Sequence, residues 1–449
     1  MGKYKVSILG TGFIGLCSAA CFADRGIYSI CSTHDQKKHD QINQGRTPFY
    51  ENGLEELVKR AVSSKMLRCT LDQEVAVLET DISMITTGTP MREDRSIDLN
   101  FIKSTAKEIG EALVKKKDYH LVVVRSTVVP GTTMNLVGRI INETSGKKLG
   151  KDFGLVMQPE FLAEGRSIQD TLYPDRIIIG ELDQKSGDIL VELYEEFYGD
   201  QFAQIPVVRM NIESAELVKY GNNILLATKI TYANDLANIA EYIPGVDIKQ
   251  VMNAVGLDYR INELFLGAGV GFGGACFHKD LNALLAFGRE HGYESRLLET
   301  VLKINDEQAE HIVEIVENEL TDLKNKQITL LGLSFKPGTD DMRHAPSIRI
   351  TNQLIKKGAT IVGYDPRAIE SAKAVLKDKI NYRSDVSSAL QGSDCVILVT
   401  EWDEFKTLKP ETFIKHMKNP LLVDGRRIYD PKIFSSKMKF KAIGLGKLD

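Results

Sequence analysis

Residues 5–26 read KVSILGTGFIGLCSAACFADRG and decide the fold, because a Gly-x-Gly-x-x-Gly turn joins a β-rich run to a helical pattern. Residues 5–9 are predicted to form a strand, and residues 16–25 a helix that ends at a glycine. A strand, a glycine turn and a helix in this order are the start of a βαβ unit on a parallel sheet. The sequence therefore predicts an α/β domain whose first helix begins at the edge where parallel sheets bind ligands.

The glycine turn itself predicts a dinucleotide site. Gly10 permits a tight bend, Gly12 lets the backbone approach a pyrophosphate, and Gly15 packs the helix against the strand. The pyrophosphate then binds at the helix N-terminus, beside Phe13 and Ile14.

The second strand departs from this pattern. An acid that bonds the adenosine ribose is expected roughly twenty residues after the glycines. Thr33 stands there, and the nearest acid is Asp35. Lys37 and Lys38 lie close enough to meet a 2′-phosphate. NAD is the favoured cofactor, and NADP is the alternative.

The alternation of strands and helices predicts the domain organisation. Further strands are expected at residues 82–86, 121–125, 155–157 and 176–179, and again at 328–333, 360–364, 395–400 and 421–424. Between these runs, residues 211–242 form one long helical pattern, and more helix follows to about residue 320. We expect two Rossmann-like parallel-sheet domains joined by a helical central domain: residues 1–208 bind the dinucleotide, 209–310 carry the long helix, and 311–449 form the second α/β domain.

Composition narrows the class of protein. The net charge of −4 gives no basic footprint for nucleic acid, and no apolar run reaches membrane-spanning length. The N-terminus runs into the first strand rather than a signal peptide, and the six cysteines show no paired spacing. We expect a cytoplasmic enzyme with reduced thiols, no nucleic-acid or membrane partner and no metal site.

One glycine-rich segment, GFGGACFHKD at residues 271–280, carries the chemistry. Cys276 precedes a helix predicted over residues 279–288, and a helix N-terminus with neighbouring cations such as Lys279 favours the thiolate. A buried structural cysteine is the commoner fate of this residue. The glycines and Asp280 four residues later favour catalysis.

A nucleophilic thiol suits the oxidation of an alcohol to an acid, which needs two hydride removals. Cys276 would hold the intermediate aldehyde as a thiohemiacetal, and the thioester formed next would be hydrolysed.

Other polar residues fit this scheme. Lys219 and Asn223 stand four apart on one helix face and would stabilise an oxyanion, or belong to a solvated stripe. Glu160 and Glu164 follow a strand and would handle protons and water, or only pair with a helix dipole. Thr127 would bond a water or a sugar hydroxyl, or simply cap a turn.

Seven motifs together resemble the UDP-glucose 6-dehydrogenases, within the wider UDP-glucose/GDP-mannose dehydrogenase superfamily. They are GTGFIG at 10–15, TGTP at 87–90, RSTVVPGTT at 125–133, PEFLAEG at 159–165, GFGGACFHKD at 271–280, GLSFKPGTDDMRHAPS at 332–347 and DGRR at 424–427. The resemblance implies a homo-oligomer, at least a dimer through the central helices. It also implies a two-step, four-electron oxidation that consumes two NAD per sugar and turns the C6 hydroxyl of UDP-glucose into the carboxylate of UDP-glucuronate.

The resemblance also assigns roles to residues. Cys276 is implied as the nucleophile, with Lys219, Asn223 and Asp280 supporting the oxyanion and the hydrolytic water. Positions that assist proton transfer and water placement are Thr127, Glu160 and Glu164. Positions implied to contact the sugar or UDP are Glu160, Phe161, Leu162, Lys219, Asn223, Arg260, Phe265, Leu266, Phe272, Gly273, Phe335, Lys336 and Arg426, with Arg260 reaching from a neighbouring subunit. The cofactor positions are Gly10, Gly12, Phe13, Ile14, Gly15, Thr33, Lys38, Thr89, Ser126, Thr127, Glu164, Lys279 and Arg343.

Three residues depart from the family pattern. Thr33 replaces the usual ribose-binding acid, and His278 stands where proline or glutamine is usual. Arg125 replaces a frequent lysine, a change that we interpret as neutral. Three rival functions stay open. The first keeps the chemistry with GDP-mannose or a UDP-N-acetylhexosamine as substrate, and the second is an epimerase that retains its NAD. The third is a nucleotide-sugar-binding protein without activity. Cys276 speaks against the epimerase, which needs no acyl nucleophile.

Overall fold

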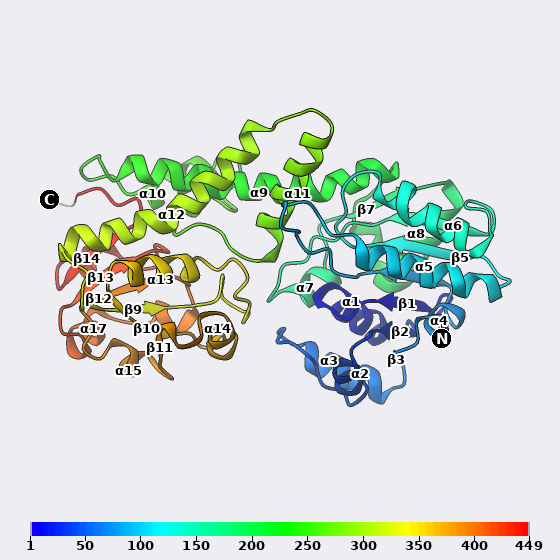
Figure 1. Cartoon of the computed structure of the whole chain (residues 1–449), viewed down its shortest axis with the longest axis horizontal. Helices are drawn as coiled ribbons and strands as arrows, with labels where there is room; N and C mark the ends of the chain where they lie inside the picture. The colour runs from blue at the N-terminus through cyan, green and yellow to red at the C-terminus, as the bar shows by residue number, and fades with distance from the viewer. Residues whose placement is uncertain (1, 448–449) are drawn as a thin grey trace. The chain divides into compact units, whose positions relative to one another are not determined.

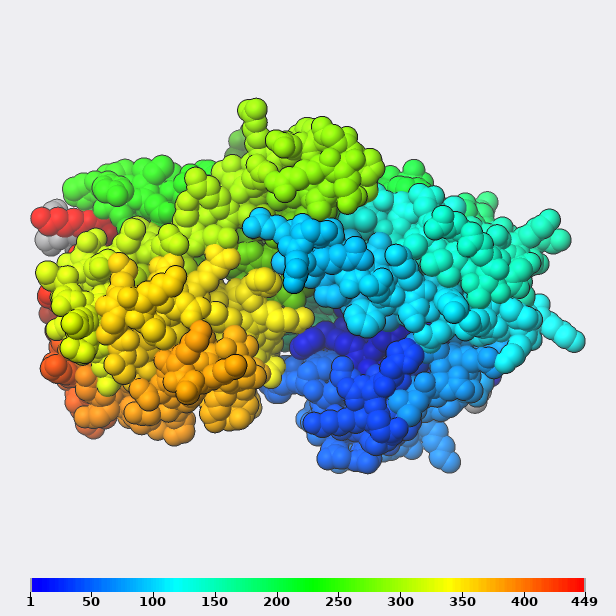
Figure 2. All heavy atoms as spheres, in the orientation of Figure 1, coloured from blue at the N-terminus to red at the C-terminus, as the bar shows by residue number. Residues whose placement is uncertain are grey.

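The computed structural model describes residues 2–447 of the chain. Backbone contacts divide the chain into two compact units, Met1–Asn222 and Asn223–Asp449. Each unit contains one sheet with helices on both faces (Figure 1), and side chains fill the space between the ribbons of each unit (Figure 2). None of the helices described is long and apolar enough to cross a membrane.

The first unit is built on an eight-stranded sheet with the order β3-β2-β1-β4-β5-β6-β7-β8. Its strands are β1 (Val6–Leu9), β2 (Ser29–Ser32), β3 (Leu67–Thr70), β4 (Ile82–Ile85), β5 (His120–Val124), β6 (Phe153–Met157), β7 (Ile177–Glu181) and β8 (Val207–Met210). The order reverses between β1 and β4, which both pair in parallel with their neighbours. The carboxyl ends of these two strands are therefore the switch point at which such sheets bind ligands.

Helices cover both faces of this first sheet. They are α1 (Phe13–Asp24), α2 (Gln36–Asn43), α3 (Leu54–Ser63), α4 (Gln73–Leu78), α5 (Asn100–Lys115), α6 (Arg139–Ser145), α7 (Ser167–Leu172), α8 (Gln184–Tyr198) and the start of α9 (Ile212–Ala240). One core joins α1, α3 and α8 to the sheet, and the other joins α4, α5 and α6 to the opposite face. Successive residues of β1, Ile8 and Leu9, enter different cores. This is why the strand reads as an almost continuous apolar run.

The second unit repeats the same winding with six strands in the order β11-β10-β9-β12-β13-β14. They are β9 (Gln327–Leu331), β10 (Thr360–Tyr364), β11 (Asn381–Tyr382), β12 (Cys395–Leu398), β13 (Leu421–Asp424) and β14 (Lys439–Ala442). All five pairings are parallel. The order reverses between β9 and β12, so this sheet has a switch point of its own.

Helices cover both faces of the second sheet, and the long ones lie on the same face. The helices that follow α9 are α10 (Ile248–Gly256), α11 (Ala275–Glu290), α12 (Arg296–Leu320), α13 (Pro346–Lys356), α14 (Ile369–Leu376), α15 (Val386–Leu390), α16 (Asp403–Lys406), α17 (Pro410–His416) and α18 (Pro431–Ser435). The C-terminal half of α9 shares a core with α12, α13 and the sheet. A second core on the opposite face is formed with α15, α17 and α18.

The predicted fold class is confirmed: two α/β units, with a long helix and further helices between the two groups of strands in the sequence. The long helix predicted over 211–242 is α9, and the helical stretch ends at Leu320. The predicted division into three domains stays a prediction, because the contacts divide the chain at one position only.

Several local predictions were wrong. The first sheet is not wholly parallel, since β7 pairs with β6 in the antiparallel direction. The strands β3, β8, β11 and β14 were not predicted, because each is only two to four residues long and alternates with polar or exposed positions. The helix placed over 279–288 begins four residues earlier, at Ala275. Cys276 is therefore inside the first turn of α11 rather than ahead of it.

Candidate active site

The glycine turn after β1 has the geometry that a pyrophosphate needs. Gly10 has a φ of +119°, which favours glycine, and a Cβ on Gly15 would lie 1.9 Å from the Gly10 carbonyl oxygen. A Cβ on Gly12 would meet nothing within 4 Å, so this side of the turn is open. No side chain caps α1, and its first turn holds no acid. The open glycine and the uncapped amides therefore fit a dinucleotide phosphate.

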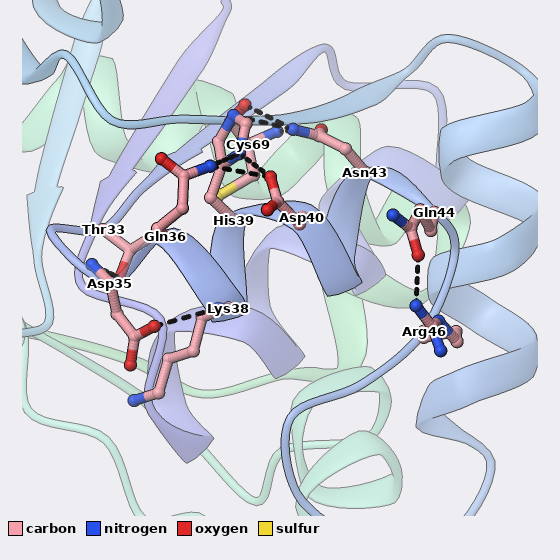
Figure 3. A network of polar contacts seen from close by, with 10 residues as sticks. All are labelled: Thr33, Asp35, Gln36, Lys38, His39, Asp40, Asn43, Gln44, Arg46 and Cys69. Carbon is pink, nitrogen blue, oxygen red and sulfur yellow. Dashed lines mark hydrogen bonds and ion pairs between the residues drawn. The ribbon is translucent and has the colours of Figure 1, made fainter.

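At the end of β2, Thr33 takes the place of an acid (Figure 3). Its Oγ1 accepts a hydrogen bond from the Asp35 N–H at 3.2 Å. Asp35 caps α2 by accepting from the Lys38 N–H at 3.1 Å. The nearest carboxylate is thus already a helix cap, and Thr33 presents a neutral hydroxyl at the ribose position.

Hydrogen bonds from hydroxyl side chains connect the two loops that follow β4 and β5. The Thr89 Oγ1 donates to the Thr127 carbonyl oxygen at 2.9 Å, and the Ser126 Oγ donates to the Thr87 carbonyl oxygen at 2.7 Å. Thr127 is half-buried, whereas Thr89 and Ser126 are buried. These three predicted positions therefore form one small region beside the switch point of the first sheet.

A buried ion pair lies beyond β6. The Lys219 ammonium, on α9, lies 2.9 Å from Glu160 Oε1 and donates to the Glu160 carbonyl oxygen at 2.7 Å. Burial raises the pKa of Glu160, but the Lys219 cation and the Leu162 N–H lower it, and its net pKa lies below the usual value. The loop also holds Phe161, whose ring packs under the Arg176 guanidinium at 4.0 Å. Glu160, Phe161, Leu162 and Lys219 therefore lie together beyond β6.

Two buried acids that the sequence did not single out hold this region in place. Glu51 accepts from the N–H groups of Gly165 and Ser167, both at 2.8 Å, and so fixes the segment that follows the half-buried Glu164. Glu216, one turn before Lys219 on α9, accepts from the N–H of Thr133 at 2.7 Å. No local motif marks either acid. Their partners are more than eighty residues away in the sequence.

In the second unit, an acid on α11 is held from two sides. Asp280 is 1% exposed, and its Oδ2 accepts from the Asn223 amide at 2.6 Å. Its Oδ1 accepts from the Lys279 ammonium at 2.6 Å. Cys276 lies one turn earlier on the same helix and is exposed, whereas the other five cysteines are buried. Cys276, Lys279 and Asp280 thus lie on the first two turns of α11, and Asn223 of α9 contacts Asp280.

The glycine loop before α11 is fixed by asparagines from two long helices. The N–H of Gly269 donates to Asn234 Oδ1 at 2.7 Å, from α9. The N–H of Phe272 donates to Asn305 Oδ1 at 2.7 Å, from α12, and Asn305 returns a bond to the Phe272 carbonyl oxygen. Sequence reasoning missed both asparagines. A polar residue inside a buried helix face was the available signal.

The glycines of this loop make room for the predicted nucleotide residues after β9 and β13. A Cβ on Gly274 would lie 2.8 Å from the Phe335 ring, and one on Gly273 would lie 2.6 Å from the His344 carbonyl oxygen. Lys336 holds its ammonium 5.5 Å from the Phe335 ring centroid. Arg426 follows β13 and donates to the Gly271 carbonyl oxygen at 3.3 Å. Phe272, Gly273, Phe335, Lys336 and Arg426 therefore lie around one loop at the switch point of the second sheet.

His278 is buried beneath this loop rather than beside the thiol. Its ring stacks on His344 with centroids 4.8 Å apart. Burial lowers the pKa of His278 to about 4, with a further contribution from the neighbouring His344. A neutral imidazole in this position packs the loop and is not a general acid near neutral pH.

Four other predicted residues have separate surroundings. Arg260 is exposed and pairs with Asp258 at 2.5 Å, and Arg343 pairs with Asp341 at 2.6 Å. Arg343 does touch the loop through its backbone, since its carbonyl oxygen accepts from the Gly274 N–H at 2.9 Å. Phe265 is partly exposed at a φ of +65°, whereas Leu266 is buried in the core.

The arrangement can support covalent chemistry at a thiol beside a buried, doubly held carboxylate, with a dinucleotide site in the first unit. Within the described residues no group of histidines, cysteines and acids could hold a metal ion.

Comparison with known proteins covers almost the whole chain. Residues 4–198, 213–307 and 329–431 match, in order, the NAD binding, central and UDP binding domains of the UDP-glucose/GDP-mannose dehydrogenase family. The UDP-glucose 6-dehydrogenase of Haloferax volcanii is 42% identical over 424 residues, which cover 94% of this chain and 97% of that protein. The GDP-mannose 6-dehydrogenase of Pseudomonas savastanoi pv. phaseolicola is 36% identical, covering 94% of this chain and 98% of that protein.

A solved structure is similar over the same length. The UDP-glucose dehydrogenase from the hyperthermophilic archaeon Pyrobaculum islandicum matches with a TM-score of 0.91 and 36% identity, covering 99% of this chain and 98% of that one. The similarity therefore extends from sequence to fold in both units.

Proposed function

Because this chain belongs to the UDP-glucose/GDP-mannose dehydrogenase family, we propose that it oxidises the C6 hydroxyl of UDP-glucose to the carboxylate of UDP-glucuronate. It is an oxidoreductase with a nicotinamide-binding and a UDP-binding domain. One observation carries the proposal. Cys276 is an exposed thiol in the first turn of α11, one turn from the buried Asp280 that Lys279 and Asn223 hold.

NAD is proposed as the cofactor of the first unit. The open face at Gly12 and the uncapped start of α1, where Phe13 and Ile14 lie, support this cofactor. Thr89, Ser126 and Thr127 at the ends of β4 and β5 are proposed to contact it as well. When bound, NAD supplies the acceptor for one hydride in each of two oxidations. Glu164, Lys279 and Arg343 are proposed as further cofactor contacts.

Cys276 acts between the two oxidations. The first oxidation converts the C6 alcohol to an aldehyde, and the thiolate adds to this carbonyl to give a thiohemiacetal. Loss of the second hydride gives a thioester, and water then cleaves its C–S bond to release the acid and regenerate the thiol. One alcohol and one water thus give one carboxylate, two NADH and three protons.

The buried groups around these steps have separate roles. Asn223 and the Lys219 ammonium stabilise negative charge on the C6 oxygen. Asp280 orients the hydrolytic water, because both its oxygens are fixed by neighbours. Glu160, whose pKa is lowered, stays ionised near neutral pH. It accepts protons through water, with Thr127 and Glu164 placing that water.

UDP-glucose is proposed as the substrate because the relatives include enzymes named for it at 42% and 39% identity. Phe272, Gly273, Phe335, Lys336 and Arg426 are proposed to contact the nucleotide. Phe161, Leu162, Phe265 and Leu266 are proposed to contact the sugar. The same chemistry on GDP-mannose is the second candidate, favoured by relatives named for that sugar at 36% identity.

A homodimer through the central helices is part of the proposal, as is the division into domains at 1–208, 209–310 and 311–449. Leu225, Tyr232 and Ile239 stand seven residues apart on α9, each at least half exposed. Three apolar side chains at this spacing form one stripe along a helix, which a second copy would cover. Arg260 would then act from the partner. Light scattering of the wild type and a Leu225→Glu/Tyr232→Glu variant tests this, because a wild-type monomer would contradict it.

A spectrophotometric assay tests the activity. UDP-glucose, UDP-N-acetylglucosamine and GDP-mannose are each offered with NAD, and reduced cofactor is followed at 340 nm, about the nicotinamide absorbance maximum. The proposal expects the highest kcat/KM for UDP-glucose. A preference for GDP-mannose would favour the second candidate, and no net reduced cofactor would favour an epimerase or an inactive binding protein.

A further inference from the structure

The adenosine end of the cofactor site is neutral or basic rather than acidic. In dinucleotide-binding folds a carboxylate at the end of the second strand bonds the ribose hydroxyls and repels a 2′-phosphate. Here that position is Thr33, whose side chain is buried and whose Oγ1 accepts from the Asp35 N–H at 3.2 Å. The hydroxyl keeps its proton for donation, and a donor suits a phosphate oxygen as well as a ribose hydroxyl.

The nearest carboxylates are committed to other partners. Asp35 accepts from the Lys38 N–H at 3.1 Å and caps α2, as Figure 3 shows. Asp40 accepts from the Gln36 amide at 2.8 Å and lies 2.8 Å from the His39 ring. Neither acid therefore replaces the missing carboxylate at the end of β2.

Three basic residues follow the same strand end in the sequence. His34 directly follows Thr33 and is 68% exposed at its side chain, with its Nε2 3.0 Å from the Gln73 amide and 3.7 Å from Glu108. Lys37 is exposed, and Lys38 is half-buried on the first turn of α2. A dianionic phosphate placed here would meet two lysines and an imidazole, with Asp35 and Glu108 as the nearby acids.

We propose that this subsite accepts a 2′-phosphate, so that NADP serves the enzyme as well as NAD, with Thr33 as the residue that sets the preference. The inference rests on the proposed dehydrogenase function. Thr33 donates to the 2′-substituent in both cofactors. Lys37 and Lys38 bind the added phosphate as point charges. The carboxylate that would exclude NADP is absent from the end of β2. A carboxylate introduced at position 33 should repel the 2′-phosphate and so exclude NADP again.

The test uses nucleotide fragments, so that binding is measured without turnover. Isothermal titration calorimetry of the full chain compares adenosine 2′,5′-bisphosphate with 5′-AMP. The wild type is expected to bind the bisphosphate at least as tightly as AMP. Thr33→Asp is expected to weaken the bisphosphate about 100-fold relative to AMP, as for an introduced like charge a few ångströms away. Thr33→Ser should retain wild-type binding.

A second pair of variants keeps the proposal testable if position 33 disturbs folding. Lys37→Ala/Lys38→Ala is expected to weaken the bisphosphate about tenfold and to leave AMP unchanged, with a smaller salt dependence. Lys151→Ala is the matched control, because Lys151 is exposed and precedes the amino end of β6, four positions from β2 in the sheet.

The outcomes separate the two proposals. AMP binding about tenfold or more tighter than bisphosphate binding in the wild type would overturn this inference, even with full NAD-dependent oxidation of UDP-glucose. Equal weakening of AMP binding and bisphosphate binding in the Lys37→Ala/Lys38→Ala variant would also overturn this inference. Tight, lysine-dependent bisphosphate binding without oxidation of any nucleotide sugar would instead support the subsite and overturn the proposed function.

Discussion

The buried ion pair between Lys219 and Glu160 should show a larger coupling energy than an exposed pair of the same two residue types. Both side chains are 5% exposed, and the ammonium lies 2.9 Å from Oε1. Lys219→Met removes the cation, yet the carboxylate stays buried with only the Leu162 N–H and the charge of Arg125 to lower its pKa. In this variant burial, which raises the pKa of Glu160, becomes the largest effect on that carboxyl.

The magnitude follows from the cost of an uncompensated buried charge. Breaking such a pair on one side costs about 3–5 kcal/mol of unfolding free energy. Replacing both partners, as Lys219→Met/Glu160→Gln, leaves no buried charge and should cost clearly less than the sum of the single changes. We therefore expect a coupling energy of about 2 kcal/mol or more.

An exposed pair in the same unit is the matched control. Lys115 and Glu74 lie 2.6 Å apart with side chains 60% and 40% exposed. Their cycle, Lys115→Met and Glu74→Gln, should give a coupling energy of about 1 kcal/mol or less. Urea unfolding followed by far-UV circular dichroism at pH 7 gives both cycles. Equal coupling energies for the two pairs would refute the reasoning, because burial would then add nothing.

Two further predictions concern the second unit. The free energy of unfolding should fall as the pH drops from about 6.5 towards 4. The pKa of His278 is about 4 in the folded chain, below the unfolded value, so the unfolded chain binds the proton first. This residue should account for a loss of up to ~3 kcal/mol. His278→Gln removes that loss while His344, Asp306 and Arg349 remain around the site; an unchanged pH profile of urea midpoints in this variant would contradict it. Iodoacetamide at pH 8 should label Cys276 at least about tenfold faster than any other cysteine, since the other five are buried. Peptide mapping measures the labelling rates. Modification of Cys17, Cys31 or Cys395 at a rate similar to that of Cys276 would contradict the prediction.

The features that could be predicted from the sequence are those encoded locally. The glycine turn at 10–15 fixes the start of the first sheet through its own φ angles and close contacts. Lys219 and Asn223 are brought near acids by helical spacing, although each meets a different one, Glu160 and Asp280.

The remaining features depend on partners distant in sequence. Glu51 binds amides more than a hundred residues away, and Asn305 binds a loop 33 residues before it. The residues next to Glu51 and Asn305 in the sequence do not indicate which amides they bind. The start of α11 was misplaced for a related reason. Gly274, at a φ of +84°, ends the loop, and the helix begins directly after it without a capping side chain.

The number of reduced cofactors formed per sugar tests the central claim most directly. Purified enzyme is given a limiting amount of UDP-glucose and excess NAD, and NADH is measured at completion against UDP-glucose consumed. Oxidation through a Cys276 thiohemiacetal and thioester predicts two NADH per sugar. A ratio of one would contradict the account, because the reaction would then end at an aldehyde or a ketone and the thiol would have no intermediate to hold.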